Sequence, residues 1–144
     1  MYKVVTMDKK RMKRYKEKIM IIEKRRDNIF SWISDEDEKS VLAIYKAFQE
    51  LVESFTDIFA MMLKDLGEIV EDDYSNIEKL GEAGVFDEKQ EAVLKEANGL
   101  RNRLVHEYNG LERKTAIHSI NDVNAECDHI LEDVRTWIKK LIKK

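Results

Sequence analysis

The most regular pattern in this chain runs through residues 41–69, which read VLAIYKAFQELVESFTDIFAMMLKDLGEI. Its apolar residues recur at steps of three and four over about four heptads, as in the buried stripe of an amphipathic helix. The stripe consists of Val41, Ile44, Phe48, Leu51, Phe55, Ile58, Met62, Leu66 and Ile69. We therefore predict a long central helix of an antiparallel bundle, with its Phe and Met side chains in the core rather than around a cofactor.

Similar spacing predicts helices on both sides of this segment. One begins near Met7, a short one covers about residues 75–83, one follows Asp87, and the last follows Thr115. The absence of proline and the presence of only 5 glycines in 144 residues favour helix throughout. The sequence thus predicts an all-α fold with four main helices and one short one. We expect them to form an up-and-down bundle and a single domain over residues 1–144.

Helix boundaries are expected at small polar residues and glycines. Ser34, Ser75, Asp87 and Thr115 each stand where a helix begins, as N-cap residues do. Gly84 is expected to end the short helix, because glycine readily adopts the left-handed conformation found after helix ends.

Cysteine content and hydropathy narrow the class of protein. The single Cys127 excludes an intrachain disulfide and a cysteine-cluster metal site, which favours a reducing, cytoplasmic location. The sequence contains no apolar run near the roughly 20 residues that a membrane helix needs. The basic N-terminal segment lacks the apolar stretch of a signal peptide. We expect a cytoplasmic protein without membrane contact.

Charge is distributed unevenly along the chain. Residues 1–26 contain 11 Lys and Arg against 3 Asp and Glu, whereas residues 27–98 contain 6 against 19. The basic first segment can attract phosphate. It can equally pair with the acidic middle of the chain, and the sequence does not decide between these two interpretations.

Reactive polar residues gather in residues 98–108, which read NGLRNRLVHEY. On a helical wheel Asn98, Asn102 and His106 lie opposite the apolar stripe, and Arg101 lies between the two faces. That stripe consists of Val93, Ala97, Leu100, Leu104, Tyr108 and Leu111. Arg101 and His106 point about 140° apart. They can share a site only through the long arginine side chain, a helix distortion or a second copy of the chain.

These residue types are sufficient for RNA cleavage without a metal. His106 can take a proton near neutral pH, and Arg101 can bind a phosphate through two donors. Asn98 and Asn102 can donate to phosphate oxygens, and Tyr108 can donate a hydrogen bond or accept a transferred group. The same residues can also be an ordinary charged helix surface. The sequence shows no histidine pair with a carboxylate at metal-ligand spacing.

The segment Arg101-Asn102-Arg103-Leu104-Val105-His106-Glu107-Tyr108 resembles the R-N-x-x-x-H-x-Y signature of HEPN domains. It is most similar to the HepT subgroup, the toxin partners of minimal nucleotidyltransferase antitoxins. The resemblance extends over roughly residues 10–142, including the long helix, the 73–85 segment and the closing helix.

The resemblance implies a helical bundle that forms a homodimer and cleaves RNA as a metal-independent endoribonuclease, with no cofactor. By carry-over, Arg101 and His106 are expected to be catalytic, at a cleft to which both copies contribute. Asn102 is expected to support them, and Arg103, at a variable position of the signature, and Asn98 can add contacts to RNA. Tyr108 is the residue that a nucleotidyltransferase antitoxin would modify with AMP.

Two other functions remain open at the level of sequence. One is a non-catalytic HEPN subunit that binds substrate for a nucleotidyltransferase, and the other is a plain helical dimerisation module. The intact Arg101, His106 and Tyr108 favour the nuclease over both.

Overall fold

A computed structural model describes residues 9–106 and 110–142 of the chain. Over these residues the protein forms five α-helices and no strand. They are α1 (Lys9–Trp32), α2 (Glu38–Asp65), α3 (Asp73–Glu82), α4 (Glu88–His106) and α5 (Arg113–Ile142). The prediction of four main helices and one short helix is confirmed.

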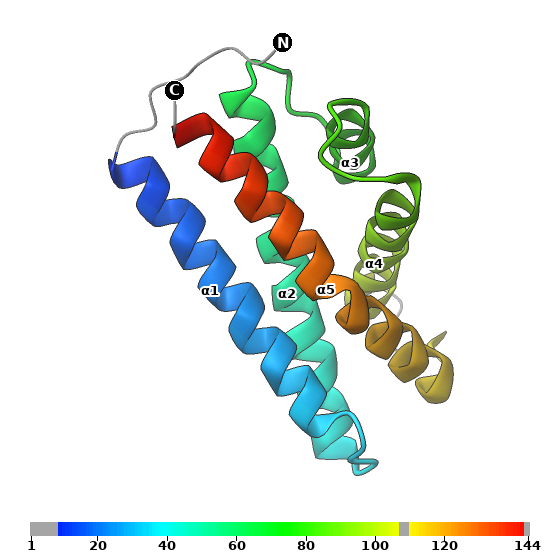
Figure 1. Ribbon diagram of the computed structural model, residues 1–144. Coiled ribbons are helices and arrows are strands. Elements are labelled where there is room, and N and C mark those ends of the chain that lie inside the picture. Colours follow the sequence, from blue (N-terminus) through cyan, green and yellow to red (C-terminus); the bar gives the residue numbers. More distant parts are fainter. Residues whose placement is uncertain (1–8, 107–109, 143–144) are drawn as a thin grey trace.

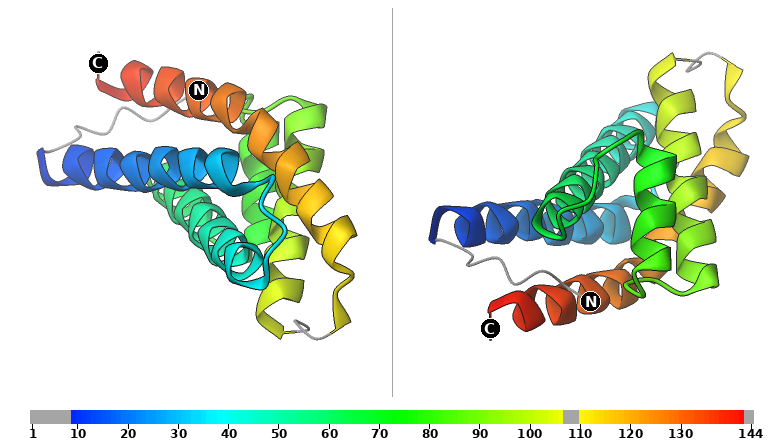
Figure 2. Two further views of the ribbon diagram at one scale, coloured as in Figure 1. Left: turned by 90° about the horizontal axis from the view of Figure 1, so that it is seen from below. Right: turned by 90° about the horizontal axis from the view of Figure 1, so that it is seen from above.

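The helices are arranged around α2 (Figure 1). Helix α2 packs against α1, α3 and α4, and α5 packs against both α1 and α4. Views from below and above show α3 and α4 on the side of the molecule away from α1 (Figure 2). The α3–α4 pair is therefore a lateral arm of the bundle, whereas α1, α2 and α5 form its main body.

The predicted stripe of the central helix forms the core, except at its C-terminal end, where Leu66 is half-buried and Ile69 is exposed. All of its members from Val41 to Met62 are buried. Ile69, however, is 74% exposed and lies outside α2, which ends at Asp65. The physical reason is Gly67, whose φ of 77° turns the chain, so that the Glu68 backbone N–H donates to the Leu63 carbonyl over 2.9 Å. The expected helix was thus one turn too long.

Three of the four expected N-caps were wrong, because a nearby acidic residue takes the role. Asp37, not Ser34, caps α2 and accepts from the Ser40 backbone N–H. Asp72, not Ser75, caps α3 and accepts from the Ser75 backbone N–H over 2.9 Å. Hydrogen bonds from Ser40 and from Ser75 lower the pKa of the Asp37 and Asp72 carboxyl groups, respectively.

The last helix, too, is capped by an acidic residue where a hydroxyl residue was expected. Glu112, not Thr115, satisfies the first turn of α5, because its carboxylate accepts from the Thr115 backbone N–H over 2.8 Å. Asp87 and Gly84 behave as expected. The Asp87 carboxylate accepts from the Gln90 backbone N–H, and Gly84, with φ of 82°, follows the end of α3.

Several basic residues of α1 pair with acids of the neighbouring helices. Ion pairs join α1 to α2 and α5: Arg11–Asp65, Lys18–Asp57, Arg25–Glu50, Arg26–Asp128 and Glu23–Arg135. Four basic residues of α1 thus pair within the fold, as the pairing interpretation of the basic N-terminal segment requires. Within the described residues, no helix is long and apolar enough to cross a membrane.

Candidate functional site

The signature segment forms the C-terminal part of α4, alongside α3. The two helices run antiparallel, because Lys95 of α4 pairs with Glu78 of α3, and Arg101, further along α4, pairs with Asp73 at the start of α3. Helix α3 begins at Asp73, so the last turn of α4 continues beyond it. The candidate site therefore lies where α3 begins and α4 ends.

Arg101 is held by two polar neighbours rather than pointing freely into solvent. Its Nη2 atom donates to Asp73 Oδ2 over 3.0 Å and to Asn98 Oδ1 over 3.0 Å. Only 18% of its side chain is exposed. Its Nε is buried and has no hydrogen-bond partner among the described residues. The guanidinium is thus fixed from one side while part of its donor capacity remains unused.

Asn98 was expected opposite the apolar stripe of α4, yet it is 2% exposed, and its carboxamide oxygen accepts from Arg101. It borders an interior space that is lined mostly by residues of α2 and α5. Arg101 was expected between the two faces of α4, and it is half-buried there beside Asp73 of α3. Asn98 therefore holds the Arg101 guanidinium from the inner side of the helix.

The remaining described residues of the signature are more open. Arg103 and His106 are exposed, and Asn102 is half-buried. His106 is the last residue of α4. Within the described part of one copy, neither a hydrogen bond nor an ion pair joins His106 to Arg101. Tyr108 lies outside the described residues, so its expected position at the site stays a prediction.

Two residues at the site escaped the sequence analysis. Asp73 and Tyr74 entered the sequence analysis only as the start of the 73–85 segment of the resemblance, without a role at the site. The available signal was charge: an acid in a short helix that precedes a basic helix is a natural partner for a buried arginine. A tyrosine beside that acid then lies close to the same arginine-rich turn.

The two histidines of α5 were expected at the surface. His118 and His129 are both exposed. The Nε2 atom of His118 lies 3.3 Å from Asp122 Oδ2, one helical turn away. Among the described residues, His, Cys, Asp and Glu form no group of three suited to a metal ion.

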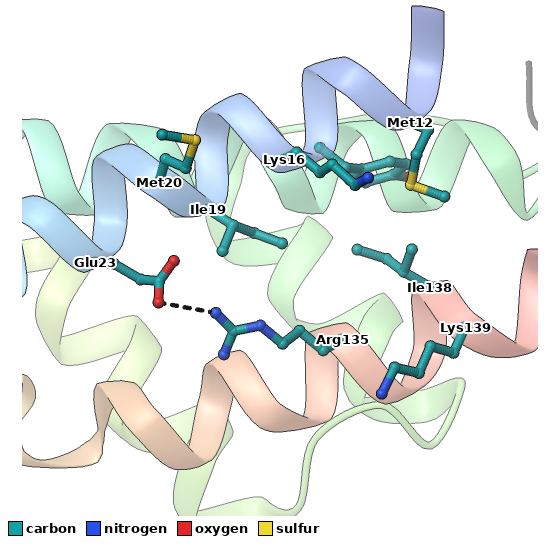
Figure 3. A pocket seen from close by; sticks show the side chains of 9 residues that line it. Met12, Lys16, Ile19, Met20, Glu23, Arg135, Ile138 and Lys139 are labelled. Carbon is teal, nitrogen blue, oxygen red and sulfur yellow. Dashed lines mark ion pairs between the residues drawn. The ribbon is translucent and has the colours of Figure 1, made fainter. Parts of the chain in front are cut away.

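A groove lies between α1 and α5, apart from the signature segment (Figure 3). Its volume is about 430 Å³, and Met12, Ile19 and Ile138 supply much of its apolar floor. Lys16 and Lys139 lie at its edges, and the Arg135–Glu23 ion pair crosses one end. Because α4 contributes no residue to it, this groove is separate from the Arg101 site.

The helical arrangement and the site define the class of protein. A bundle of this topology, with an Arg-Asn-x-x-x-His sequence on the end of its fourth helix, is a HEPN-type domain. The sequence profile described as "Ribonuclease HepT-like" matches residues 12–134. The chain belongs to the HepT-like ribonuclease family.

Two of three archaeal relatives are similar over most of the chain. Two proteins of Archaeoglobus fulgidus, each named "Putative RNase", are 39% and 42% identical to it. The first alignment covers 91% of this chain and 98% of the relative, and the second covers 71% and 76%. A protein of Methanocaldococcus jannaschii with the same description is 39% identical over 71 residues, which cover 49% of this chain and 82% of that relative.

Proposed function

We propose that this protein is a metal-independent endoribonuclease that acts as the toxin of a toxin–antitoxin pair. The observation that carries the proposal is the state of Arg101. Asp73 and Asn98 fix its guanidinium through one nitrogen, while 18% of the side chain remains exposed. A cation held in this way suits an anionic ligand, and the ribonuclease family of the chain makes RNA the natural one.

The reaction needs one base and one cation. His106 would take the proton of a ribose 2′-hydroxyl, and the resulting oxygen would attack the adjacent phosphorus. The bond from phosphorus to the 5′-oxygen then breaks, and the departing oxygen takes up a proton. The products are a 2′,3′-cyclic phosphate and a 5′-hydroxyl end. Arg101 would stabilise the negative charge that grows on the phosphate oxygens during the attack.

Two copies of the chain would complete this site. Arg101 faces α3 within one copy, whereas His106 lies exposed at the end of α4. Their directions on the helix differ by about 140°. A homodimer that brings two α4 ends together would place the His106 of one copy near the Arg101 of the other. The proposed nuclease is therefore a dimer with a shared cleft.

Tyr108 is the proposed point of control. A cognate nucleotidyltransferase would join its phenolic oxygen to the α-phosphorus of ATP, releasing pyrophosphate and the phenolic proton. The attached AMP adds bulk and negative charge two residues beyond His106. It would block RNA by steric exclusion and by repulsion.

The test uses a pair of exposed histidines. RNA cleavage is measured in an excess of EDTA for the parent, His106→Ala and His118→Ala. His106→Ala is expected to cut roughly a hundredfold more slowly, because a general base contributes at least that factor. His118→Ala removes a histidine from α5 and should cut like the parent.

Three results would overturn the proposal. Equal cleavage by His106→Ala and the parent would exclude His106 as the base. Loss of all cleavage in EDTA would show a metal-dependent reaction. A parent that never cuts RNA, yet increases the activity of a nucleotidyltransferase partner, would identify the substrate-binding subunit instead.

A further inference from the structure

We propose that Tyr74 and Arg103 form a subsite for an unpaired nucleobase of the RNA, at the point where α3 begins beside α4. This inference rests on the proposed function and extends it. It assigns a ligand, the flat face of one base, to two side chains that have no role in the cleavage chemistry. It also implies that the substrate is single-stranded at this position.

Tyr74 presents an aromatic surface at the candidate site. It follows Asp73, the partner of Arg101, and 41% of its surface is exposed. Among the described residues, Phe30 on α1 is the other exposed aromatic residue, and Val105 of α4 is exposed beside His106. Tyr74 is thus an open aromatic ring held within one residue of the Arg101 site.

A glycine in α4 allows this ring to approach. A Cβ atom built on Gly99 would lie 3.1 Å from the Tyr74 hydroxyl oxygen and 3.8 Å from Arg103 Nη1. Tyr74 and Arg103 therefore meet over the same bare patch of α4. Gly99 lies within a helix, where glycine is a poor helix former, and its missing side chain is what leaves room for the tyrosine.

The same face of α4 leads from this patch to His106. Asn102 and Arg103 lie three and four residues after Gly99, and His106 lies four and three residues after them. The four residues therefore share one side of the helix. The distance along the axis from Gly99 to His106 is about 10 Å. A base on Tyr74 and a phosphate near His106 would then belong to the same short stretch of RNA, with Arg103 between them.

The chemistry of the two side chains suits a base without requiring a particular one. Unpaired bases stack on aromatic rings, and guanidinium groups pack on the faces of bases or bind the adjoining phosphate. Every base has such a face, so the subsite selects unpaired over paired RNA more than it selects sequence. The alternative role for Tyr74 is a packing contact that only holds α3 on α4.

Binding to a non-cleavable probe separates these two roles. The probe is a 12-nucleotide 2′-O-methyl RNA, about the length of a single-strand site, and binding is followed by fluorescence anisotropy. Tyr74→Leu keeps an apolar contact but removes the ring, and it should bind about tenfold more weakly. Tyr74→Phe keeps the ring and should stay within about twofold of the parent. Phe30→Leu, at a 79% exposed aromatic residue of α1, is the matched control and should bind like the parent.

An abasic scan of the probe then locates the base. In the parent, removing one particular base should weaken binding about tenfold, whereas the same probe should bind Tyr74→Leu as well as the intact probe does. Thermal melting of Tyr74→Leu within a few degrees of the parent would show that α3 stays docked. Gly99→Ala, which crowds the ring, should weaken binding in the same direction.

The outcomes distinguish the subsite from the nuclease. If the parent cuts RNA and Tyr74→Leu binds and cuts equally well, the subsite is wrong and the nuclease stands. If affinity falls only together with the melting temperature, or the abasic scan is the same in both proteins, Tyr74 is a packing residue. If the parent neither binds nor cuts RNA, the proposed function and the subsite both fail.

Discussion

Two of the arginine–aspartate pairs that join helices in this molecule differ in what surrounds the carboxylate. In the main body, Arg11 Nε lies 2.6 Å from Asp65 Oδ1, and only 6% of the Asp65 side chain is exposed. In the lateral arm, Arg101 Nη2 lies 3.0 Å from Asp73 Oδ2, and 36% of the Asp73 side chain is exposed. The two arginine side chains are about equally exposed, at 20% for Arg11 and 18% for Arg101.

The Arg11–Asp65 pair of the main body belongs to a buried polar cluster. Tyr15 donates its hydroxyl to Asp65 Oδ2 over 2.6 Å, and Arg11 also donates to the Met61 carbonyl over 2.9 Å. Burial and the Asp65 carboxylate raise the pKa of the Tyr15 hydroxyl far above its ordinary value. Both Asp65 oxygens are occupied within the fold, so this pair stabilises the α1–α2 contact and offers nothing to a ligand.

The Arg101–Asp73 pair stays in contact with solvent. The Asp73 side chain is 36% exposed and the Arg101 side chain 18%, so a ligand can reach the pair from outside. The same two residue types thus serve structure in one region and a candidate site in the other. Burial of the acid, rather than of the arginine, distinguishes the two roles.

The largest expected effect is on stability, from removal of each acid in turn. Asp65→Ala should lower the free energy of unfolding by about 3–5 kcal/mol, because it leaves Arg11 and Tyr15 buried without their partner. Asp73→Ala should cost about 1 kcal/mol or less, since its pair is partly open to water. Urea unfolding of the two variants measures both values. Equal losses would show that the two pairs have the same structural role.

The next effect is on RNA cleavage, from replacing each arginine with lysine. Arg101→Lys should reduce the cleavage rate roughly 10- to 100-fold, because an ammonium cannot hold Asp73 and Asn98 while presenting a second edge to phosphate. Arg11→Lys is the matched control, and it should change the melting temperature but leave the cleavage rate of the folded protein intact. The reverse pattern would contradict the assignment of the two pairs.

A smaller effect concerns how the stability of the two helix starts, one in each region, depends on pH. Asp37 caps α2 and Asp72 caps α3, and hydrogen bonds lower the pKa of each carboxyl group from its ordinary value of 3.8. A lowered pKa in the folded state gives stability that is present above pH 3.8 and is lost as the pH falls through the folded-state pKa. Carboxyl-carbon NMR titration should give midpoints below 3.8 for both. A midpoint at or above that value for Asp72 alone would show that the start of α3 is loose.

The smallest effect is expected for chemical labelling of the Cys127 thiol. Cys127 lies in the core where the main body meets the arm. It borders the same interior space as Phe55 of α2 and Asn98 of α4. Burial raises the pKa of its thiol to about 12. Iodoacetamide at pH 8 should therefore leave the folded protein unlabelled over hours, and labelling should follow only the unfolded fraction in urea. Rapid labelling of the native protein would mean that the arm separates from the body.

Apolar periodicity predicted the helices because each one buries a stripe, and α2 and α5 show this most directly. From Ile120 onward, the apolar residues that recur at steps of three and four along α5 are all buried: Ile120, Val123, Cys127, Ile130, Val134, Trp137 and Leu141. Helix ends were harder, since Asp37 and Asp72 compete with Ser34 and Ser75 as caps and all four are good cap residues. Local sequence cannot decide between neighbours whose capping preferences are similar.

The site was predicted in its chemistry more than in its geometry. The signature pointed to Arg101 and His106, and a helical wheel placed Asn98 opposite the apolar stripe of α4. The wheel describes one helix alone, so it could not show that Asn98 borders an interior space lined mostly by α2 and α5. The contribution of Asp73 came from a helix nearly 30 residues earlier in the chain, at a sequence separation of 28. Contacts of this range depend on tertiary packing, which spacing within one segment does not contain.

The packing of α1 against α5 has a consequence for how the protein is made. These are the first and last helices of the described chain, and the Glu23–Arg135 ion pair joins them. A chain that leaves the ribosome from its N-terminus can pair α1 with α2 early, but the flank of α1 that meets α5 stays uncovered until α5 has been synthesised. The arm, with Arg101 and His106, is complete in sequence before α5 exists, yet α4 also needs α5 to bury its inner face. Translation therefore delays assembly of the proposed nuclease site until the final helix has emerged.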